Sequence, residues 1–277
     1  MTPDQYCRER AAKSGSSFYY SFLFLPPVKR RAITALYAFC REVDDVVDEC
    51  RDASVARAKL AWWRGEIEAV FAGNPEHPVG KALQGVVSDF NLPIELFREI
   101  IDGMEMDLDQ SRYPDFKSLQ LYCYRVAGVV GLLSVEIFGF EDRKTLDYAH
   151  ELGIALQLTN IIRDVGEDAR RNRIYLPMDE MDRYGVMQSD IMNSRDSDRF
   201  RELMAFQIVR AKRHYASALD ALPSSDRQNQ KPGLIMAAIY SALLDEIEKD
   251  PGCVLTGRTS LTPIRKVWIA WKTWGRR

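Results

Sequence analysis

The chain has 277 residues, of which 46% are hydrophobic and 28% charged, so it is long enough to bury a substantial core. Its 38 basic and 40 acidic residues give a formal net charge of −2, which argues against a nucleic-acid-binding protein. The few cysteines and histidines form no CxxC pair or zinc pattern, and no stretch reaches the roughly 18 consecutive apolar residues of a transmembrane helix. With no signal peptide at the N-terminus, we expect a cytoplasmic protein.

Helical periodicity dominates the chain from one end to the other. Apolar residues recur at three- and four-residue spacing, which predicts helices over 28–50, 54–72, 93–110, 117–139, 143–168, 196–221 and 231–249. Proline, glycine and asparagine fall between these segments, and no run alternates for more than a few residues as a strand would. We therefore predict one all-α domain over 1–277, a bundle of about eight to ten helices.

The first group of acidic residues lies in the stretch CREVDDVVDE of the helix predicted over 28–50. Arg41, Asp44 and Asp48 follow at spacings that place them on one helix face. Carboxylates this close repel one another, and valines surround them instead of lysines or serines, so an opposing charge is needed. Mg²⁺ is the natural candidate, because aspartates four residues apart can offer oxygens to one ion.

A second group repeats this arrangement in the stretch QLTNIIRDVGEDARRNR. One helix face carries four polar side chains, Gln157, Asn160, Asp164 and Asp168. Arginines suited to gripping phosphate oxygens follow at once, namely Arg170, Arg171 and Arg173. A single acidic group is more often a solvated helix face, whereas two such groups with arginines nearby indicate a site for Mg²⁺ and a diphosphate.

The stretch VAGVVGLLSVEIFGF at 126–140 is apolar on nearly every side, which predicts a helix in the middle of the bundle. Its small residues Ala127, Gly128 and Gly131 allow a close approach to the backbone, either by a neighbouring helix or by a long apolar ligand. A carbocation formed from a diphosphate ester needs apolar, aromatic walls that exclude water. The chain has aromatic residues for such walls, although most of them are equally suited to an ordinary core.

The sequence resembles the squalene/phytoene synthase family, which couples two prenyl diphosphates head to head. The resemblance covers nearly the whole chain and rests on FYYSFLFLPP, YAFCREVDDVVD, YCYRVAGVVG and the long, specific block LGIALQLTNIIRDVGEDARRNRIYLP. The SGSSFYYSF opening and the stretches AKLAWWR and DGMEMDLDQSRY are most similar to HpnD-type presqualene diphosphate synthases of bacterial hopanoid biosynthesis. The resemblance implies a helical bundle of the isoprenoid synthase type with a central apolar active-site cavity.

The resemblance also implies roles for the residues that match the family's motifs. The implied metal ligands are Asp44, Asp48, Asn160, Asp164 and Asp168, and the four aspartates together with Tyr122 form the implied catalytic set. The implied contacts to substrate are Arg41, Asp107, Val126, Ala127, Gly131, Gln157, Arg163, Arg171 and Tyr240. Some relatives carry a lysine or histidine before the first aromatic stretch, where this chain has Ser16 and Ser17, so we expect hydroxyl hydrogen bonds to substrate there.

The implied reaction joins two farnesyl diphosphates to presqualene diphosphate. One substrate ionises with the help of Mg²⁺, the C2–C3 double bond of the other attacks the allylic cation, and proton loss closes a cyclopropane. About two or three Mg²⁺ ions are expected, with Mn²⁺ as a substitute. No NADPH is expected, because reduction to squalene would be left to downstream enzymes of squalene and hopanoid synthesis.

Several alternatives to this reaction stay open. A phytoene synthase acting on geranylgeranyl diphosphate, or a dehydrosqualene or squalene synthase, would keep the same fold and chemistry. A catalytically inactive family member is disfavoured by the intact aspartates of both groups. A class I terpene cyclase shares the aspartate arrangement but would not carry the YCYRVAGVVG and LTNIIRDVGED blocks together.

The C-terminal stretch at 257–277 contains six basic residues and no acidic one. Ile264, Trp268 and Trp271 are interleaved with the basic residues, as is typical of a short helix that lies on anionic lipid. The alternative is a terminal helix docked on the bundle with a solvated basic side. We therefore expect either this docking or a peripheral contact with the cytoplasmic face of a membrane.

Overall fold

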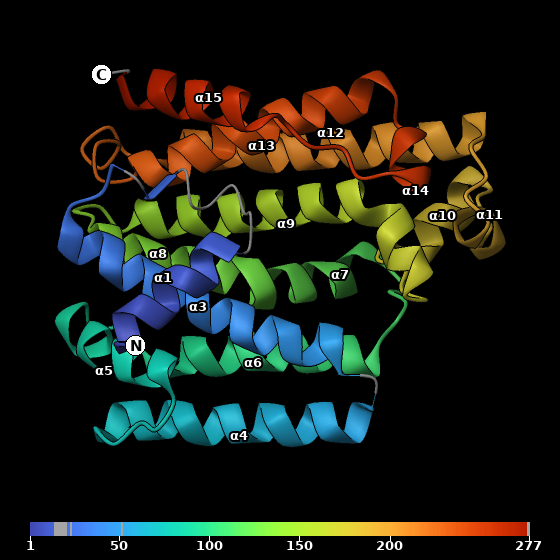
Figure 1. The fold of residues 1–277 in the computed structure, drawn as a ribbon. Helices are drawn as coiled ribbons and strands as arrows, with labels where there is room; N and C mark the ends of the chain where they lie inside the picture. The colour runs from blue at the N-terminus through green and yellow to red at the C-terminus, as the bar shows by residue number, and fades with distance from the viewer. Residues whose placement is uncertain (14–20, 23, 51, 276–277) are drawn as a thin grey trace.

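The computed structural model describes residues 1–275 apart from 14–20, 23 and 51, and in that part of the chain it contains helices and no β-strand. Figure 1 shows the long helices stacked in successive rows that run in roughly one direction. The prediction of an all-α bundle is therefore confirmed.

The helix bounds follow the chain order. The part of the chain before residue 140 forms α1 (Pro3–Lys13), α3 (Pro27–Glu49), α4 (Ala53–Ala72), α5 (Pro78–Asp89), α6 (Ile94–Asp109), α7 (Phe116–Cys123), the π-helical turn η1 (Tyr124–Gly128) and α8 (Val129–Phe138). The remainder forms α9 (Lys144–Arg170), α10 (Met178–Tyr184), α11 (Gln188–Met192), α12 (Asp198–Ala221), α13 (Lys231–Lys249), α14 (Cys253–Thr256) and α15 (Pro263–Gly275).

Each predicted helix is present, and most bounds agree within two residues. The segment predicted as one helix over 117–139 is instead divided into α7, η1 and α8. The periodicity analysis did not predict α1, α5 or the short helices α10, α11 and α14, so there are more helices than expected. Their apolar patterns are too short to stand out from loops.

Local signals explain where several helices begin and end. Pro27 occupies the first turn of α3, where its missing N–H costs nothing. The side chain of Asp115 accepts a hydrogen bond from the Ser118 amide at 2.8 Å and so caps α7. Gly73 ends α4 in the left-handed conformation with φ of 87°, which glycine adopts without strain.

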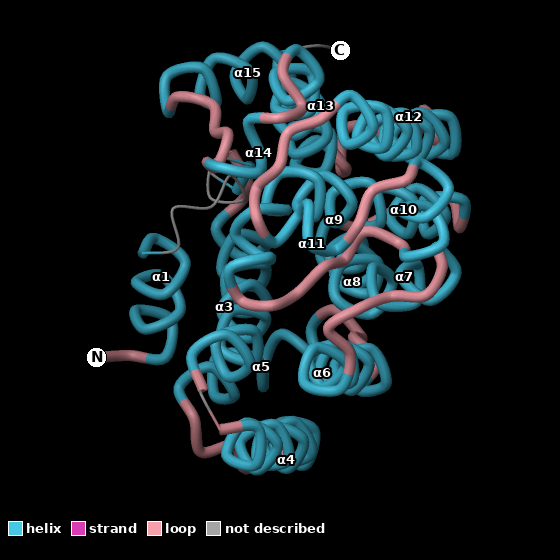
Figure 2. The backbone as a smooth tube through the Cα atoms, turned by 90° about the vertical axis from the view of Figure 1, so that its right-hand side faces the viewer, coloured by secondary structure: helices cyan, strands magenta, loops and turns pink. Residues whose placement is uncertain are grey.

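The bundle has two hydrophobic cores on either side of a central layer. One core is built mainly from α1 and α3 to α6, and the other mainly from α7, α9, α12 and α13. Helix α8 serves both, because Val129 and Leu133 belong to the first core and Val135 to the second. Figure 2 shows α8 and α7 between α6 and the helices of the second core.

The central layer is unusually apolar. By length and composition Phe116–Phe138 could cross a membrane, but it lies between the two cores, as the core helix of a bundle does. Two glycines let it pack closely on α9. A Cβ atom on Gly131 would lie 2.5 Å from the carbonyl oxygen of Ala149, and one on Gly153 would lie 2.6 Å from that of Ala127. Of the two expected reasons for small residues here, close packing of a neighbouring helix is confirmed.

Candidate active site

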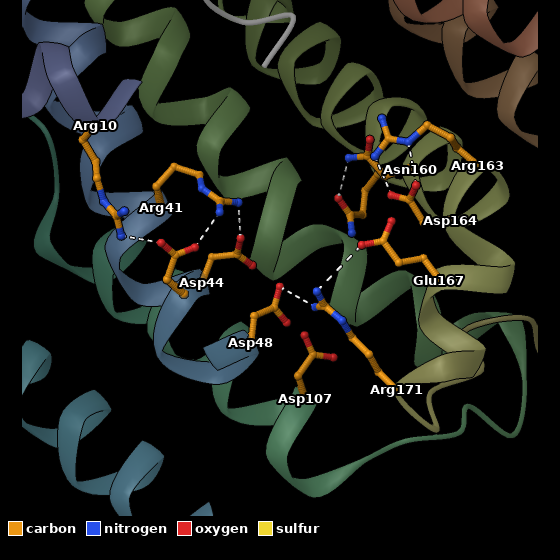
Figure 3. A network of polar contacts seen from close by, with 12 residues as sticks. Arg10, Arg41, Asp44, Asp48, Asp107, Asn160, Arg163, Asp164, Glu167 and Arg171 are labelled. Atoms are coloured by element: carbon orange, nitrogen blue, oxygen red, sulfur yellow. Dashed lines mark hydrogen bonds and ion pairs between the residues drawn. The ribbon is translucent and has the colours of Figure 1, made fainter. Parts of the chain in front are cut away.

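A polar cavity of about 660 Å³ opens between α3 and α9, with α6 and α13 also contributing to its walls. Its acidic side chains are Asp44, Asp48, Asp107, Asp164, Glu167 and Asp168. Its basic side chains are Arg41, Arg163, Arg171, Arg173, Arg258 and Lys266. Figure 3 shows the carboxylates of α3 and α9 facing one another across this space. The fold thus brings together the two groups of aspartates that the sequence places more than 100 residues apart.

On the α3 side, Arg41 binds two neighbouring carboxylates. Its guanidinium donates to Asp44 Oδ2 and to Asp45 Oδ1, each at 2.5 Å. Asp45 is also paired with Arg10 of α1, so it joins two helices, whereas Asp44 lines the cavity. Burial raises the pKa of Asp44 to about 6; Arg41 opposes this effect, and repulsion from Asp48 adds to it.

Asp48 connects the two sides of the cavity. Arg171 Nη1 lies 2.9 Å from Asp48 Oδ2, and Arg173 Nη1 lies 2.9 Å from Asp48 Oδ1. Both arginines follow directly after the last turn of α9. The basic residues of the second sequence block therefore reach the aspartate group of the first.

On the α9 side, two arginines hold Asp164. Arg163 donates to its two oxygens at 2.7 and 2.5 Å, and Arg258, from the loop after α14, donates from Nε at 3.0 Å. Asp168 lies one turn further along α9. Burial raises the pKa of Asp168 to about 8, with repulsion from Asp164 and Asp107 as the next causes. Asp168 thus lacks enough positive charge nearby to ionise easily.

Asn160 completes this face of α9. Its amide nitrogen donates to Gln157 Oε1 at 3.2 Å, while its own carbonyl oxygen is buried and has no hydrogen-bond partner. A buried carbonyl oxygen without a partner is costly unless it binds something. Together with carboxylates of raised pKa, this oxygen donor set fits a hard divalent cation such as Mg²⁺.

Three of the cavity aspartates are paired with arginines in this structure. Among the described residues, no three His, Cys, Asp or Glu side chains gather closely enough to hold one metal ion. Guanidinium groups lie beside Asp44, Asp48 and Asp164 instead, where they supply part of the missing positive charge. The metal-ligand roles expected from the sequence therefore remain predictions.

Asp107 of α6 also lines the polar cavity and is bound by tyrosines. Tyr175 Oη donates to its Oδ1 at 2.7 Å, and Tyr122 Oη donates to its Oδ2 at 2.9 Å. Burial raises the pKa of Asp107 to about 6, although both hydrogen bonds and Arg173 oppose the shift. The rings of Tyr122 and Tyr175 stack with centroids 5.2 Å apart, so the expected catalytic tyrosine belongs to an aromatic wall.

A second, apolar cavity of about 170 Å³ continues from the polar one, and the two share Tyr37, Gln157 and Asn160. Four residues with implied substrate contacts line this cavity, namely Val126, Ala127, Gly131 and Gln157. Tyr240 lines the polar cavity instead. Ser16 and Ser17 lie outside the described residues. A diphosphate site beside an apolar pocket is the arrangement that a prenyl diphosphate requires.

The model of the squalene/phytoene synthase family matches residues 11–265. The chain belongs to this family. The family consists of prenyltransferases that condense two prenyl diphosphates head to head. Among curated relatives, phytoene synthase of Arthrospira platensis is 39% identical over 274 residues, which cover 94% of this chain and 89% of that protein. The 15-cis-phytoene synthase of Synechocystis sp. is 38% identical over 280 residues, covering 96% and 83%.

Solved structures of the squalene/phytoene synthase family are similar along nearly the whole length. A dehydrosqualene synthase solved with a ligand superposes with a TM-score of 0.87 at 29% identity, covering 98% of this chain and 95% of that one. The squalene synthase HpnC of Alicyclobacillus acidocaldarius superposes with a TM-score of 0.81 at 28% identity, covering 90% and 94%. The expected isoprenoid synthase fold is therefore confirmed.

Several cavity residues of this family member were not expected from the sequence. Tyr37 lies one turn before Arg41 on the same face of α3, so helical spacing was an available signal. Tyr175 follows Arg173 in the block RIYLP. Arg258 gives no local signal, because it is 94 residues from its partner Asp164 and only the fold brings them together.

Proposed function

We propose that this chain condenses two molecules of geranylgeranyl diphosphate head to head to form phytoene. The observation that carries the condensation is the polar cavity with its two facing aspartate groups, which opens into an apolar pocket. The choice of substrate is supported by the curated relatives, which are phytoene synthases at 38–39% identity over nearly the whole chain. These relatives favour phytoene over the presqualene diphosphate expected from the sequence.

The polar cavity would hold the diphosphate. Lys266 lies beside Arg163 and Arg258, and its pKa is lowered by burial and by these two cations, so this wall favours an anion. The aspartates of α3 and α9, with the unpartnered oxygen of Asn160, would hold Mg²⁺. Bound there, Mg²⁺ supplies the positive charge that makes diphosphate a good leaving group.

The apolar cavity would hold the prenyl chain and exclude water. When the C1–O bond of one substrate breaks, both electrons stay with the diphosphate and an allylic cation remains at the junction of the two cavities. The rings of Tyr37, Tyr122 and Tyr175 line the polar cavity and offer π-electron density to that cation. The double bond of the second substrate then attacks the cation before water reaches it. Loss of a proton closes a cyclopropane that still carries the second diphosphate. When that diphosphate also leaves with its bonding electrons, the ring opens by rearrangement and loss of a second proton gives phytoene, so that two diphosphates and two protons are released in all.

A second candidate keeps the chemistry and shortens the substrate. Condensation of two farnesyl diphosphates to presqualene diphosphate is supported by the motifs that resemble HpnD-type enzymes. The likeness to a dehydrosqualene synthase and to the squalene synthase HpnC, at 28–29% identity, supports it as well. We propose that neither reaction needs NADPH, and that downstream enzymes take over the product.

The deciding experiment supplies purified protein with Mg²⁺ and either geranylgeranyl or farnesyl diphosphate, with and without NADPH, and identifies products by mass spectrometry. Phytoene from geranylgeranyl diphosphate, unaffected by NADPH, is the expected result. Presqualene diphosphate from farnesyl diphosphate would replace the first candidate with the second. Turnover of neither substrate overturns both.

A paired variant tests the aspartates. Asp48→Ala is expected to lower kcat by roughly 100-fold or more, because it removes an electrostatic contact in the polar cavity. Its matched control is Glu49→Ala, since Glu49 is exposed and outside the cavity. Equal activity in both variants would show that Asp48 has no part in turnover.

A further inference from the structure

The outward face of α15 is apolar, whereas the solvent-facing side of a surface helix normally carries polar and charged residues. Ile264 is 82% exposed, Trp268 54% and Trp271 67%, and Val267 is also exposed. These four residues follow at i, i+3, i+4 and i+7, so they form one continuous stripe. We call them the α15 stripe. Ile269 and Ala270 point the other way and are buried.

Helix α15 is firmly docked, so the stripe is not the side of a loose tail. Arg265 Nη1 binds Glu246 Oε1 of α13 at 2.6 Å, and Lys231 Nζ binds the carbonyl oxygen of Trp274 at 2.6 Å. The ring of Phe24 stacks on Trp274 with centroids 5.0 Å apart. Of the two arrangements expected from the sequence, docking on the bundle is therefore observed, and it leaves the apolar stripe outermost.

Basic side chains border the stripe. Arg265 and Lys272 lie along one edge of it, and Lys272 Nζ sits 4.7 Å from the centroid of the Trp268 ring. No acidic residue occurs anywhere in 257–277. Tryptophans with basic neighbours on one helix face are the composition of a helix that rests in the interface of an anionic bilayer. With 13 residues α15 rises about 20 Å, too short to cross the hydrocarbon layer.

The position of α15 links its outer face to the polar cavity. Lys266 of α15 and Arg258 to Leu261 of the preceding loop all line that cavity. Figure 1 shows α15 along an outer edge of the bundle, and Figure 2 shows it at the periphery from a second direction. A surface that touched the stripe would therefore rest on the outer side of a helix that also contributes Lys266 to the wall of the cavity.

We propose that the α15 stripe docks this protein on the surface of a membrane that contains anionic lipid, with Trp268 and Trp271 at the headgroup level. A second copy of the chain is disfavoured on this face. A symmetric pair would bring Lys272 of both copies toward one another, with no acidic residue of α15 to compensate. An anionic lipid surface satisfies both the apolar stripe and its basic edge.

The test is co-sedimentation of the full chain with vesicles, and it uses no prenyl diphosphate, so it is independent of the proposed function. Vesicles of equal parts phosphatidylglycerol and phosphatidylcholine are compared with vesicles of phosphatidylcholine alone. The wild type is expected to bind the anionic vesicles and to be released by high salt. The double variant Trp268→Ser, Trp271→Ser is expected to bind roughly tenfold more weakly or worse.

Two further variants distinguish the contribution of the stripe from that of exposed tryptophan elsewhere and from that of basic charge. Trp62→Ser is the matched control, because Trp62 is also an exposed tryptophan but lies on α4, at the opposite edge of the bundle (Figure 1). It should bind like the wild type. Lys272→Ser should weaken binding to anionic vesicles roughly fivefold, while binding to phosphatidylcholine stays unchanged. Thermal melting of each variant confirms that it is folded.

Other outcomes overturn the proposal. If the wild type does not bind anionic vesicles, or if the Trp62 control loses binding equally, the α15 stripe is not a membrane-binding surface. A dimer in sedimentation without lipid that the double tryptophan variant abolishes would assign the stripe to self-association instead. Truncation of the tail is a poorer test, because Arg258 and Lys266 line the cavity.

Discussion

Asp168 has a strongly raised pKa because of its position in the polar cavity. It lies on α9 near three other carboxylates, and burial with their repulsion raises its pKa to about 8, far above the ordinary value for aspartate. Between the two pKa values the folded protein binds a proton here that the unfolded chain does not. The stability contributed by this residue is therefore present at acidic pH and is lost as the pH rises toward 8. A cation at the site would reverse that loss.

Replacement of this aspartate therefore separates stability from activity. Without divalent cations, Asp168→Asn is expected to melt at a higher temperature than the wild type at pH 8, with the difference shrinking toward pH 5. Its turnover should be lost. The control is Asp182→Asn, an exposed residue on α10. Thermal melts of the wild type and both variants across this pH range test the effect. A difference in melting temperature between Asp168→Asn and the wild type that does not change with pH would contradict it.

Asp107 is stabilised differently, through two tyrosine hydroxyls that point at its oxygens. A third tyrosine, Tyr113, stacks on Tyr175 with centroids 5.7 Å apart, but its buried hydroxyl has no hydrogen-bond partner. The three rings are in contact with one another. Only two of their hydroxyls contribute a hydrogen bond.

This contrast predicts opposite effects of one chemical change. Tyr175→Phe should destabilise the fold by about 1–3 kcal/mol, because a buried carboxylate loses a donor. Tyr113→Phe should be neutral or stabilising, since it removes a hydroxyl that is buried without a partner. Urea denaturation of the two variants gives both values. A larger loss in Tyr113→Phe would mean that its hydroxyl is satisfied in solution.

Helices η1 and α8 pack on α9 more closely than ordinary side chains allow. A Cβ atom on Gly153 would meet backbone atoms of Ala127 and Gly128 at 2.6 Å, and backbone cannot rotate away as a side chain can. The same stretch carries Ala127 to the wall of the apolar cavity. The shape of that cavity therefore depends on the distance between these helices.

A glycine pair tests this dependence. Gly153→Ala is expected to cost about 1–3 kcal/mol, since the helices must separate, and to lower turnover by distorting the cavity. Gly65→Ala is the matched control, because Gly65 lies mid-helix in α4 with nothing within 4 Å of its added Cβ. It should stabilise by about 0.5–1 kcal/mol through helix propensity. Denaturation midpoints distinguish the two, and equal effects would rule out the steric explanation.

At the scale of the whole molecule, the polar cavity lies between two cores that meet along α8. Asp48 of α3 and the arginines after α9 bridge it. A ligand held by both aspartate groups would contact both sides at once. Its binding would then resist the separation of the two halves.

Ligand-dependent melting tests this arrangement. Mg²⁺ together with inorganic diphosphate, at about 100 times the dissociation constant, is expected to raise Tm by roughly 5–10 °C. Mg²⁺ alone should act weakly, because it lacks the bridging anion. The double variant Asp48→Asn, Asp164→Asn should lose the shift. An undiminished shift in that variant would place the ligand elsewhere.

The helical class, the long helices and the two aspartate groups can be predicted from the sequence, because each depends on residues close together along the chain. Asp44 and Asp48 share a helix face through spacing alone, as do Asn160, Asp164 and Asp168. The resemblance to the family's motifs also predicts the kind of reaction and most of the residues that line the cavities.

How these parts meet depends on contacts between residues that are far apart along the chain. The pairing of Asp48 with Arg171 and of Asp164 with Arg258 joins residues 123 and 94 positions apart, and no local pattern predicts such contacts. The division of 117–139 by η1 and the outward apolar face of α15 likewise follow from which neighbours pack on each helix. Periodicity shows that a helix has an apolar side; the fold determines whether that side meets the core, the cavity or the outside.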